Sequence, residues 1–131
     1  MKAIGVAAAL AGAAVIGACG GGGGGAPTSP STGGGGTSAA TITIGSDGRV
    51  SPANVAVPAG SRVTFVNNHN RAHDMSSDPH PEHNQCPEIN VGNLQPGQSR
   101  PTQNLTTPRT CGFHDHNEPT NEALMGTIRI Q

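Results

Sequence analysis

A glycine-rich stretch limits which part of this chain can fold. Residues 20–40 contain two runs of glycine, at 20–25 and 33–36, and the remainder is serine, threonine, proline and alanine. Such a segment cannot bury apolar surface and is expected to be a flexible coil. The folded part is therefore predicted to be one domain of residues 41–131, which is long enough for a single core of modest stability.

The residues before the glycines are typical of a bacterial lipoprotein signal. Lys2 precedes an apolar run at 3–16, which is too short to span a bilayer and has the length of a signal-peptide core. The run ends in VIGAC, which resembles the lipobox whose cysteine becomes lipidated after cleavage. We expect a signal peptide at 1–18 and a lipidated Cys19 with a flexible linker at 19–40. The domain would then be extracytoplasmic and anchored to a membrane; a plain signal peptide with an incidental cysteine is the alternative.

Strand and turn signals fill the domain, and only one helical turn is expected, at 122–125. Short alternating or extended runs predict strands at 41–44, 50–57, 61–67, 99–105, 110–116 and 126–130. Pro52 interrupts the second run, which indicates an edge strand or a bulge. Residues 68–95 show little periodicity and are predicted to be a long, functional loop. Several short strands at this spacing indicate an all-β fold, an antiparallel β-sandwich.

Charge and histidine content point to a metal rather than to nucleic acid. The formal net charge is −1 and the single lysine is Lys2, so we expect no nucleic-acid partner. Histidine is the commonest protein metal ligand, and neutral imidazole suits copper and zinc. All six histidines fall within one part of the chain, at His69, His73, His80, His83, His114 and His116. Any one of them alone would be interpreted as a solvated loop residue.

The cysteine count allows two interpretations. If Cys19 carries lipid, Cys86 and Cys111 remain as an even pair in an oxidising compartment. A disulfide closing that loop would stabilise the fold by about 3 kcal/mol in the chain-entropy model. Alternatively, Cys111 is a metal thiolate and Cys86 is free.

Three segments resemble the cupredoxins, the small blue-copper proteins that include plastocyanin. The sequence VSPANVAVPAGSRVTFVNN at 50–68 is similar to the N-terminal half of such a domain, and His73 falls where the first copper histidine follows the Asn-Asn pair. The sequences LQPGQS at 94–99 and GTIRI at 126–130 resemble a later turn and the last strand. The resemblance covers residues 42–131 and implies a cupredoxin-like Greek-key antiparallel β-sandwich that binds one copper ion.

The remaining copper ligands of the family can be placed in two ways. In the first, Cys111 is the thiolate, His114 follows it and Met125 is the weak axial ligand. In the second, a gapless alignment of residues 105–115 puts Asp115 where the family has its copper cysteine. Strand alternation favours the second, because it places Cys111 in mid-strand, on the same face as Asp115 and short of the ligand loop.

The second alignment implies a colourless site with nitrogen and oxygen ligands, for copper or another divalent metal. His116 is the nearest further histidine, and His114 would serve if the strand bulges there. Glu118 lies where the second family histidine would be, and His80 and His83 would form a second copper-handling patch or gate the first. The candidate ligands are therefore His73, Asp115, His116 and His114, followed by His80, His83, Glu118 and Met125, with Cys111 only if it is not disulfide-bonded.

Three function classes are compatible with these residues. The leading one is a lipid-anchored, extracytoplasmic copper-binding protein that acts in electron transfer with a redox-protein partner or in copper handling. The second is a metal-free interaction module on the same sandwich. The third is a small enzyme with type-2 copper, which nothing in the sequence requires. A Ser-His-Asp hydrolase is not expected, because no G-x-S-x-G nucleophile elbow occurs.

Overall fold

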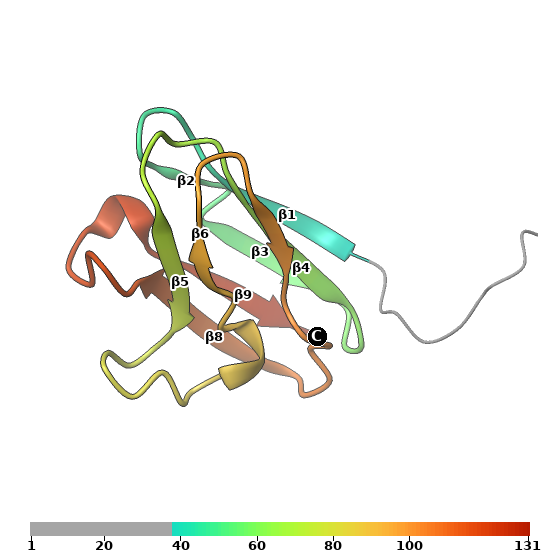
Figure 1. Cartoon of the computed structure of the whole chain (residues 1–131). Coiled ribbons are helices and arrows are strands. Elements are labelled where there is room, and N and C mark those ends of the chain that lie inside the picture. Colours follow the sequence, from blue (N-terminus) through green and yellow to red (C-terminus); the bar gives the residue numbers. More distant parts are fainter. Residues whose placement is uncertain (1–37) are drawn as a thin grey trace, which may run out of the picture. The chain divides into compact units, whose positions relative to one another are not determined.

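A computed structural model describes residues 38–131, which form the β-sandwich drawn in Figure 1. The expected signal peptide, Cys19 and most of the expected linker lie outside the described residues. The first strand begins at Ser38, so the folded part starts slightly before the predicted boundary at residue 41. Among the described residues, no helix is long and apolar enough to cross a membrane.

The described strands form two sheets, with the order β2-β1-β4-β7 in the first and β3-β9-β8-β5-β6 in the second. The elements are β1 (Ser38–Ile44), β2 (Val50–Ser51), β3 (Asn54–Val57), β4 (Arg62–Asn67), β5 (His73–Ser77), η1 (Pro87–Ile89), β6 (Gly92–Leu94), β7 (Ser99–Pro101), β8 (Arg109–Asp115), η2 (Glu122–Leu124) and β9 (Gly126–Ile130). The all-β sandwich is confirmed. Both sheets are mixed, because β1 pairs with β4 and β3 pairs with β9 in parallel.

The run at 50–57 is divided between the two sheets. Val50 and Ser51 pair with β1, whereas residues 54–57 pair with β9 in the other sheet. Pro52 and Ala53 lie between the two short strands, and each strand lies at the edge of its sheet. The predicted edge position is confirmed. A proline is tolerated at a sheet edge because no neighbouring strand there requires the N–H group that proline lacks.

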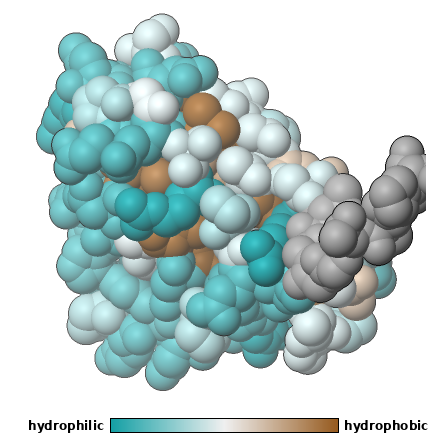
Figure 2. All heavy atoms as spheres, turned by 45° about the vertical axis from the view of Figure 1, so that its right-hand side comes forward, coloured by the Kyte–Doolittle hydropathy of each residue, from teal (hydrophilic) through white to brown (hydrophobic). Residues whose placement is uncertain are grey.

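The core lies between the sheets and is built from alternating strand residues. In β4, Val63 and Phe65 are buried, whereas Arg62 and Thr64 are only partly buried. Phe65 packs edge-on against Phe113 of β8, with ring centroids 5.3 Å apart and an interplanar angle of 79°. The two phenylalanines thereby join the first sheet to the second. On the face drawn in Figure 2, hydrophilic residues dominate and apolar residues reach the surface mainly in a central area.

The predicted loop at 68–95 is wrong over much of its length. It contains β5, η1 and β6, and β5 lies between β8 and β6 within the second sheet. Four of the five residues of β5 are buried, including the polar His73, Ser76 and Ser77. A strand covered on both faces has no polar–apolar alternation, which is the pattern that sequence analysis recognises. The longest irregular segment that remains is residues 78–86.

Candidate metal centre

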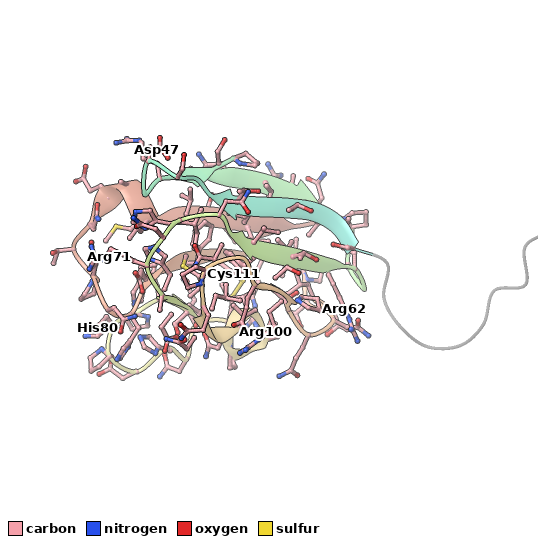
Figure 3. The ribbon with its side chains drawn as sticks, turned by 45° about the horizontal axis from the view of Figure 1, so that its top comes forward. Asp47, Arg62, Arg71, His80, Arg100 and Cys111 are labelled. Atoms are coloured by element: carbon pink, nitrogen blue, oxygen red, sulfur yellow. A yellow bond between two sulfur atoms is a disulfide. The ribbon has the colours of Figure 1, made fainter. Side chains whose placement is uncertain are left out.

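The disulfide between Cys86 and Cys111 is present, and it decides between the two sequence alignments. Both cysteines are completely buried, and Cys111 lies in the interior in Figure 3, whereas His80 lies at the periphery. A sulfur atom bonded to another sulfur is not a thiolate, so Cys111 cannot be the copper ligand of the first alignment. Glu88 lies near the two sulfur atoms but forms an ion pair with Arg109.

Strand β8 ends in two polar residues, His114 and Asp115, whose side chains lie on opposite faces. Asp115 and His114 are both buried, yet the ring of His114 meets the loop at 78–86, whereas the carboxylate of Asp115 meets His73. Successive side chains of a strand point to opposite faces, so neighbours in sequence become members of different sites. The ligand set expected as one site is therefore divided between two places.

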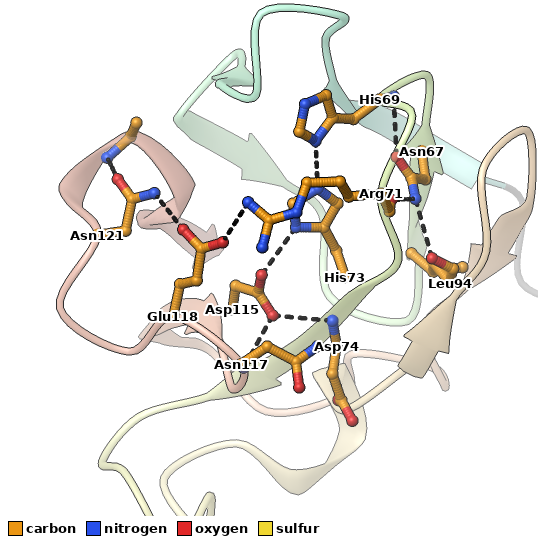
Figure 4. A network of polar contacts seen from close by, with 11 residues as sticks. Asn67, His69, Arg71, His73, Asp74, Leu94, Asp115, Asn117, Glu118 and Asn121 are labelled. Atoms are coloured by element: carbon orange, nitrogen blue, oxygen red, sulfur yellow. Dashed lines mark hydrogen bonds and ion pairs between the residues drawn. The ribbon is translucent and has the colours of Figure 1, made fainter.

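His73 and Asp115 form the first group, which we call the inner pair (Figure 4). Nδ1 of His73 donates to Oδ2 of Asp115 over 2.7 Å, and each side chain is 1% exposed. The other carboxylate oxygen accepts the backbone N–H groups of Asp74 and Asn117, at 2.9 and 3.0 Å. Both oxygens of Asp115 are therefore satisfied by protein groups.

The second ring nitrogen of His73 also has a protein partner. Nε2 of His73 lies 2.8 Å from Nδ1 of His69, and the two rings are stacked. The backbone N–H of His69 donates to Oδ1 of Asn67 over 2.9 Å. The side-chain amide of Asn67 donates to the carbonyls of Arg71 and Leu94, at 2.8 and 2.9 Å, and so ties the β4–β5 loop to β6.

Glu118 and Met125 are the two remaining candidates from the C-terminal loop, and Glu118 lies beside this network (Figure 4). Oε1 of Glu118 forms an ion pair with Nη1 of Arg71 at 3.0 Å, and Oε2 accepts from Nδ2 of Asn121 at 2.8 Å (Figure 4). Met125 is partly buried and lies between η2 and β9. Glu118 therefore uses both oxygens in contacts with protein groups.

The inner pair does not fit a blue-copper centre, which needs two imidazoles and a thiolate in a trigonal arrangement. The sulfur of Cys111 is bonded to that of Cys86. The rings of His114 and His116 contact His83 of the loop instead. What remains at the inner pair is one imidazole and one carboxylate that are hydrogen-bonded to each other.

The second group consists of His80, His83, His114 and His116, which we call the imidazole cluster. Nε2 of His83 lies 3.2 Å from Nε2 of His114 and 3.2 Å from Nδ1 of His116. The donor atoms of His80, His83 and His114 all lie within 4.8 Å of one another, so one ion can reach them. Within the cluster, His114 is buried, whereas His80 and His116 are exposed.

The loop at 78–86 folds back onto β8 and brings the cluster together. The backbone N–H of Asp78 donates to the carbonyl of Gly112 at 3.1 Å, and the N–H of Gly112 donates to Oε1 of Gln85 at 3.0 Å. The disulfide adds a covalent tie at the end of the same loop. His80 and His83, from the loop, thereby reach two histidines that lie more than thirty residues away in sequence.

His83 has an unusual backbone conformation, with φ at +50°. Its N–H donates to the carbonyl of Pro79 over 2.7 Å, and its carbonyl accepts from Nδ2 of Asn90 at 3.0 Å. Positive φ values are uncommon for residues other than glycine, and they persist where the surroundings hold them. The loop therefore holds His83 in a conformation that directs its ring to β8.

The pKa of His83 lies below its ordinary value. Partial burial is the largest cause, and the positive charges that His114, His116 and His80 carry when protonated lower the pKa further, whereas Asp74 raises it. A lowered pKa keeps the ring neutral at pH 7, and the neutral imidazole is the form that binds a metal.

Asp78 and Gly112 support the cluster and were missed by sequence analysis. Nδ1 of His114 donates to Oδ1 of Asp78 over 2.7 Å. A Cβ atom on Gly112 would lie 1.9 Å from Oδ2 of Asp78, so the carboxylate occupies the place of a side chain. A glycine inside a strand is a signal for such a close approach. That signal was available at Gly112, but it does not say which group approaches.

Comparisons with known proteins identify the fold. No family model matches the sequence, and no curated protein matches it. Among solved structures, a purple cupredoxin from Nitrosopumilus maritimus is 20% identical with a TM-score of 0.58, and it covers 70% of this chain and 99% of its own. Plastocyanin from Dryopteris crassirhizoma is 20% identical with a TM-score of 0.55 and the same coverage. Auracyanin from Roseiflexus castenholzii is 18% identical with a TM-score of 0.54, covering 75% of this chain and 99% of its own. Residues 38–131 therefore form a cupredoxin-like domain.

Proposed function

We propose that this protein binds and hands on copper through imidazole and carboxylate groups, and does not carry electrons through a copper–thiolate bond. One observation carries the proposal: the sulfur atoms of Cys86 and Cys111 are bonded to each other. Blue-copper electron transfer depends on a short bond between copper and a cysteine thiolate. Within residues 38–131 no other cysteine occurs, so imidazoles are the main donors for a metal.

The histidine content supports copper over harder metals. Neutral imidazole binds copper and zinc well, whereas calcium and magnesium prefer oxygen ligands. The similar solved structures include a purple cupredoxin, a plastocyanin and an auracyanin, which support copper by fold alone. Bound copper would supply a redox-active Lewis acid, and the part of this chain is to hold the ion at the surface, where partners can exchange it.

We also propose that the domain works outside the cytoplasm and is tethered through a lipid on Cys19. The support is the signal-like sequence at 1–18 and the disulfide, since disulfides persist in oxidising compartments. A glycine-rich tether would let the domain meet membrane-bound and free partners.

Titration of the full chain with Cu²⁺, with its disulfide intact, tests the copper proposal. We expect tight binding with only a weak visible absorption, and a higher melting temperature with Cu²⁺, because a ligand that binds only the folded state must stabilise it. Mg²⁺ is the control ion and should leave the melting temperature unchanged. An intense blue colour would contradict the proposal, since it would require a thiolate ligand. Absence of binding would favour the metal-free interaction module.

A further inference from the structure

We propose that the metal site of this protein is the imidazole cluster on the outer face of β8, with Asp78 as the residue that positions His114. The site would take one divalent ion of the borderline class, Cu²⁺ or Zn²⁺. Its use for copper rests on the proposed function, but the existence of the site does not. It lies on the opposite face of β8 from Asp115, the residue aligned with the copper cysteine of cupredoxins.

The spacing of the ring nitrogens matches that of ligands on one ion. Two imidazole nitrogens bound at roughly 2.0–2.1 Å, with an angle between square-planar and tetrahedral, lie about 2.9–3.4 Å apart. Nε2 of His83 is 3.2 Å from a nitrogen of His114 and 3.2 Å from a nitrogen of His116. Without a metal, at least one proton must lie between each pair of nitrogens, because two bare lone pairs repel. A metal ion would replace those protons.

Asp78 sets the nitrogen of His114 that is free to bind. Its carboxylate accepts the Nδ1–H of His114 at 2.7 Å. In the neutral ring, Nε2 then carries no proton and its lone pair can bind a metal. That nitrogen is the one that faces His83. Metal-binding histidines commonly donate their other N–H to a carboxylate, which fixes the tautomer and the ring orientation.

The site is also rigid on one side and open on the other. His114 is 2% exposed, and the loop that covers it is tied to β8 by Gly112 and by the disulfide at Cys111. His80 and His116 are exposed to solvent. A buried anchor with exposed outer ligands can hold an ion and still release it to a partner.

The inner pair is a poorer site by the same criteria. Both nitrogens of His73 and both oxygens of Asp115 already have protein partners, and the pair is almost completely buried. His69, His73 and Asp115 do not place three donor atoms within 4.8 Å of one another, whereas His80, His83 and His114 do. His73 and Asp115, the two residues that align with copper ligands of cupredoxins, are therefore bonded to each other, and the proposed metal site lies on the opposite face of β8.

Two groups of variants separate the sites. In the full chain, His83→Asn combined with His116→Gln removes two cluster ligands; Asn tolerates the positive φ of position 83. His69→Gln is the matched control, because it removes a histidine next to the inner pair. Binding of Cu²⁺ and Zn²⁺ is measured by calorimetry, and electron paramagnetic resonance of bound Cu²⁺ counts its nitrogen ligands. We expect the double variant to lose most affinity and nitrogen couplings, and the control to keep both.

A second comparison tests the positioning role of Asp78. Asp78→Asn should weaken metal binding by about 10- to 100-fold, the usual effect of removing the carboxylate partner of a ligating histidine. Glu82→Gln removes the same charge from the same loop and is the control. Equal losses in the two variants would show a general charge effect and overturn the positioning role. The spectrum of bound Cu²⁺ should change only in Asp78→Asn.

The outcomes distinguish this inference from the proposed function. Binding of Cu²⁺ that survives in the double variant but is lost in His69→Gln would overturn the inference and leave the proposed function standing. Binding of Zn²⁺ but not Cu²⁺ at the cluster would do the reverse. Absence of binding for both ions would overturn both.

Discussion

His114 and Asp115 are neighbours in sequence, but their side chains belong to two separate polar groups. The ring of His114 contacts Asp78 and His83 on the outer face of β8, whereas the carboxylate of Asp115 is buried against His73. One peptide step along the strand therefore separates a group of histidines suited to a metal from a hydrogen-bonded pair in the interior.

Substitution of Asp115 by Asn should destabilise the fold. The carboxylate accepts three hydrogen bonds in the interior, and an amide group would place N–H donors against donors. Leaving a buried donor without an acceptor costs about 1 to 3 kcal/mol. Urea unfolding of metal-free protein measures the loss, with His116→Gln as the exposed control that should change little. Equal stability of Asp115→Asn and wild type would contradict a structural role for the hydrogen bond between His73 and Asp115.

Substitution of Gly112 by Ala should weaken metal binding through Asp78. The new Cβ would meet Oδ2 of Asp78 and push the carboxylate away from His114. Calorimetric titration with Zn²⁺ measures the affinity in a double-mutant cycle with Asp78→Ala. Because Asp78→Ala removes the clashing atoms, the double variant should bind no more weakly than Asp78→Ala alone. Additive losses would mean that Gly112 acts by another route.

Thiol counting tests the disulfide. Denatured but unreduced protein that lacks Cys19, made as Cys19→Ser, should contain no free thiol, because Cys86 and Cys111 are bonded. Replacing both with Ala should lower the free energy of unfolding by about 3 kcal/mol in the chain-entropy model. It should also weaken metal binding, because the loop at 78–86 loses its covalent tie to β8. Two free thiols in the unreduced protein would refute the pairing.

Lipid attachment is expected only when Cys19 is present. Bacterial cells that express the full chain and are fed labelled palmitate should incorporate the label, whereas Cys19→Ser should not. The unlabelled variant should also leave the detergent phase in phase partitioning, because no helix in residues 38–131 is long and apolar enough to cross a membrane. Equal labelling of the wild-type protein and Cys19→Ser would contradict lipid attachment at Cys19.

Several features could be predicted from the sequence alone, because they depend on local patterns. The alternation in β4 identified Val63 and Phe65 as core residues, and Pro52 marked the edge strands. The even number of cysteines after Cys19 indicated the bond between Cys86 and Cys111, which the structure contains. The strand patterns depend on which nearby residues lie on the same face, and the cysteine count depends on an oxidising compartment. Both can be read from the sequence without knowledge of the tertiary structure.

Only the tertiary structure decided which histidines meet. Strand β5 was missed because four of its five residues are buried, which removes the alternation that marks a strand. That strand pairs with β8 and carries the loop at 78–86 back over it, so His83 reaches His114 across thirty-one residues of sequence. Proximity of this kind depends on sheet order and loop closure, which no local pattern encodes; the same is true of the space at Gly112 that the carboxylate of Asp78 fills.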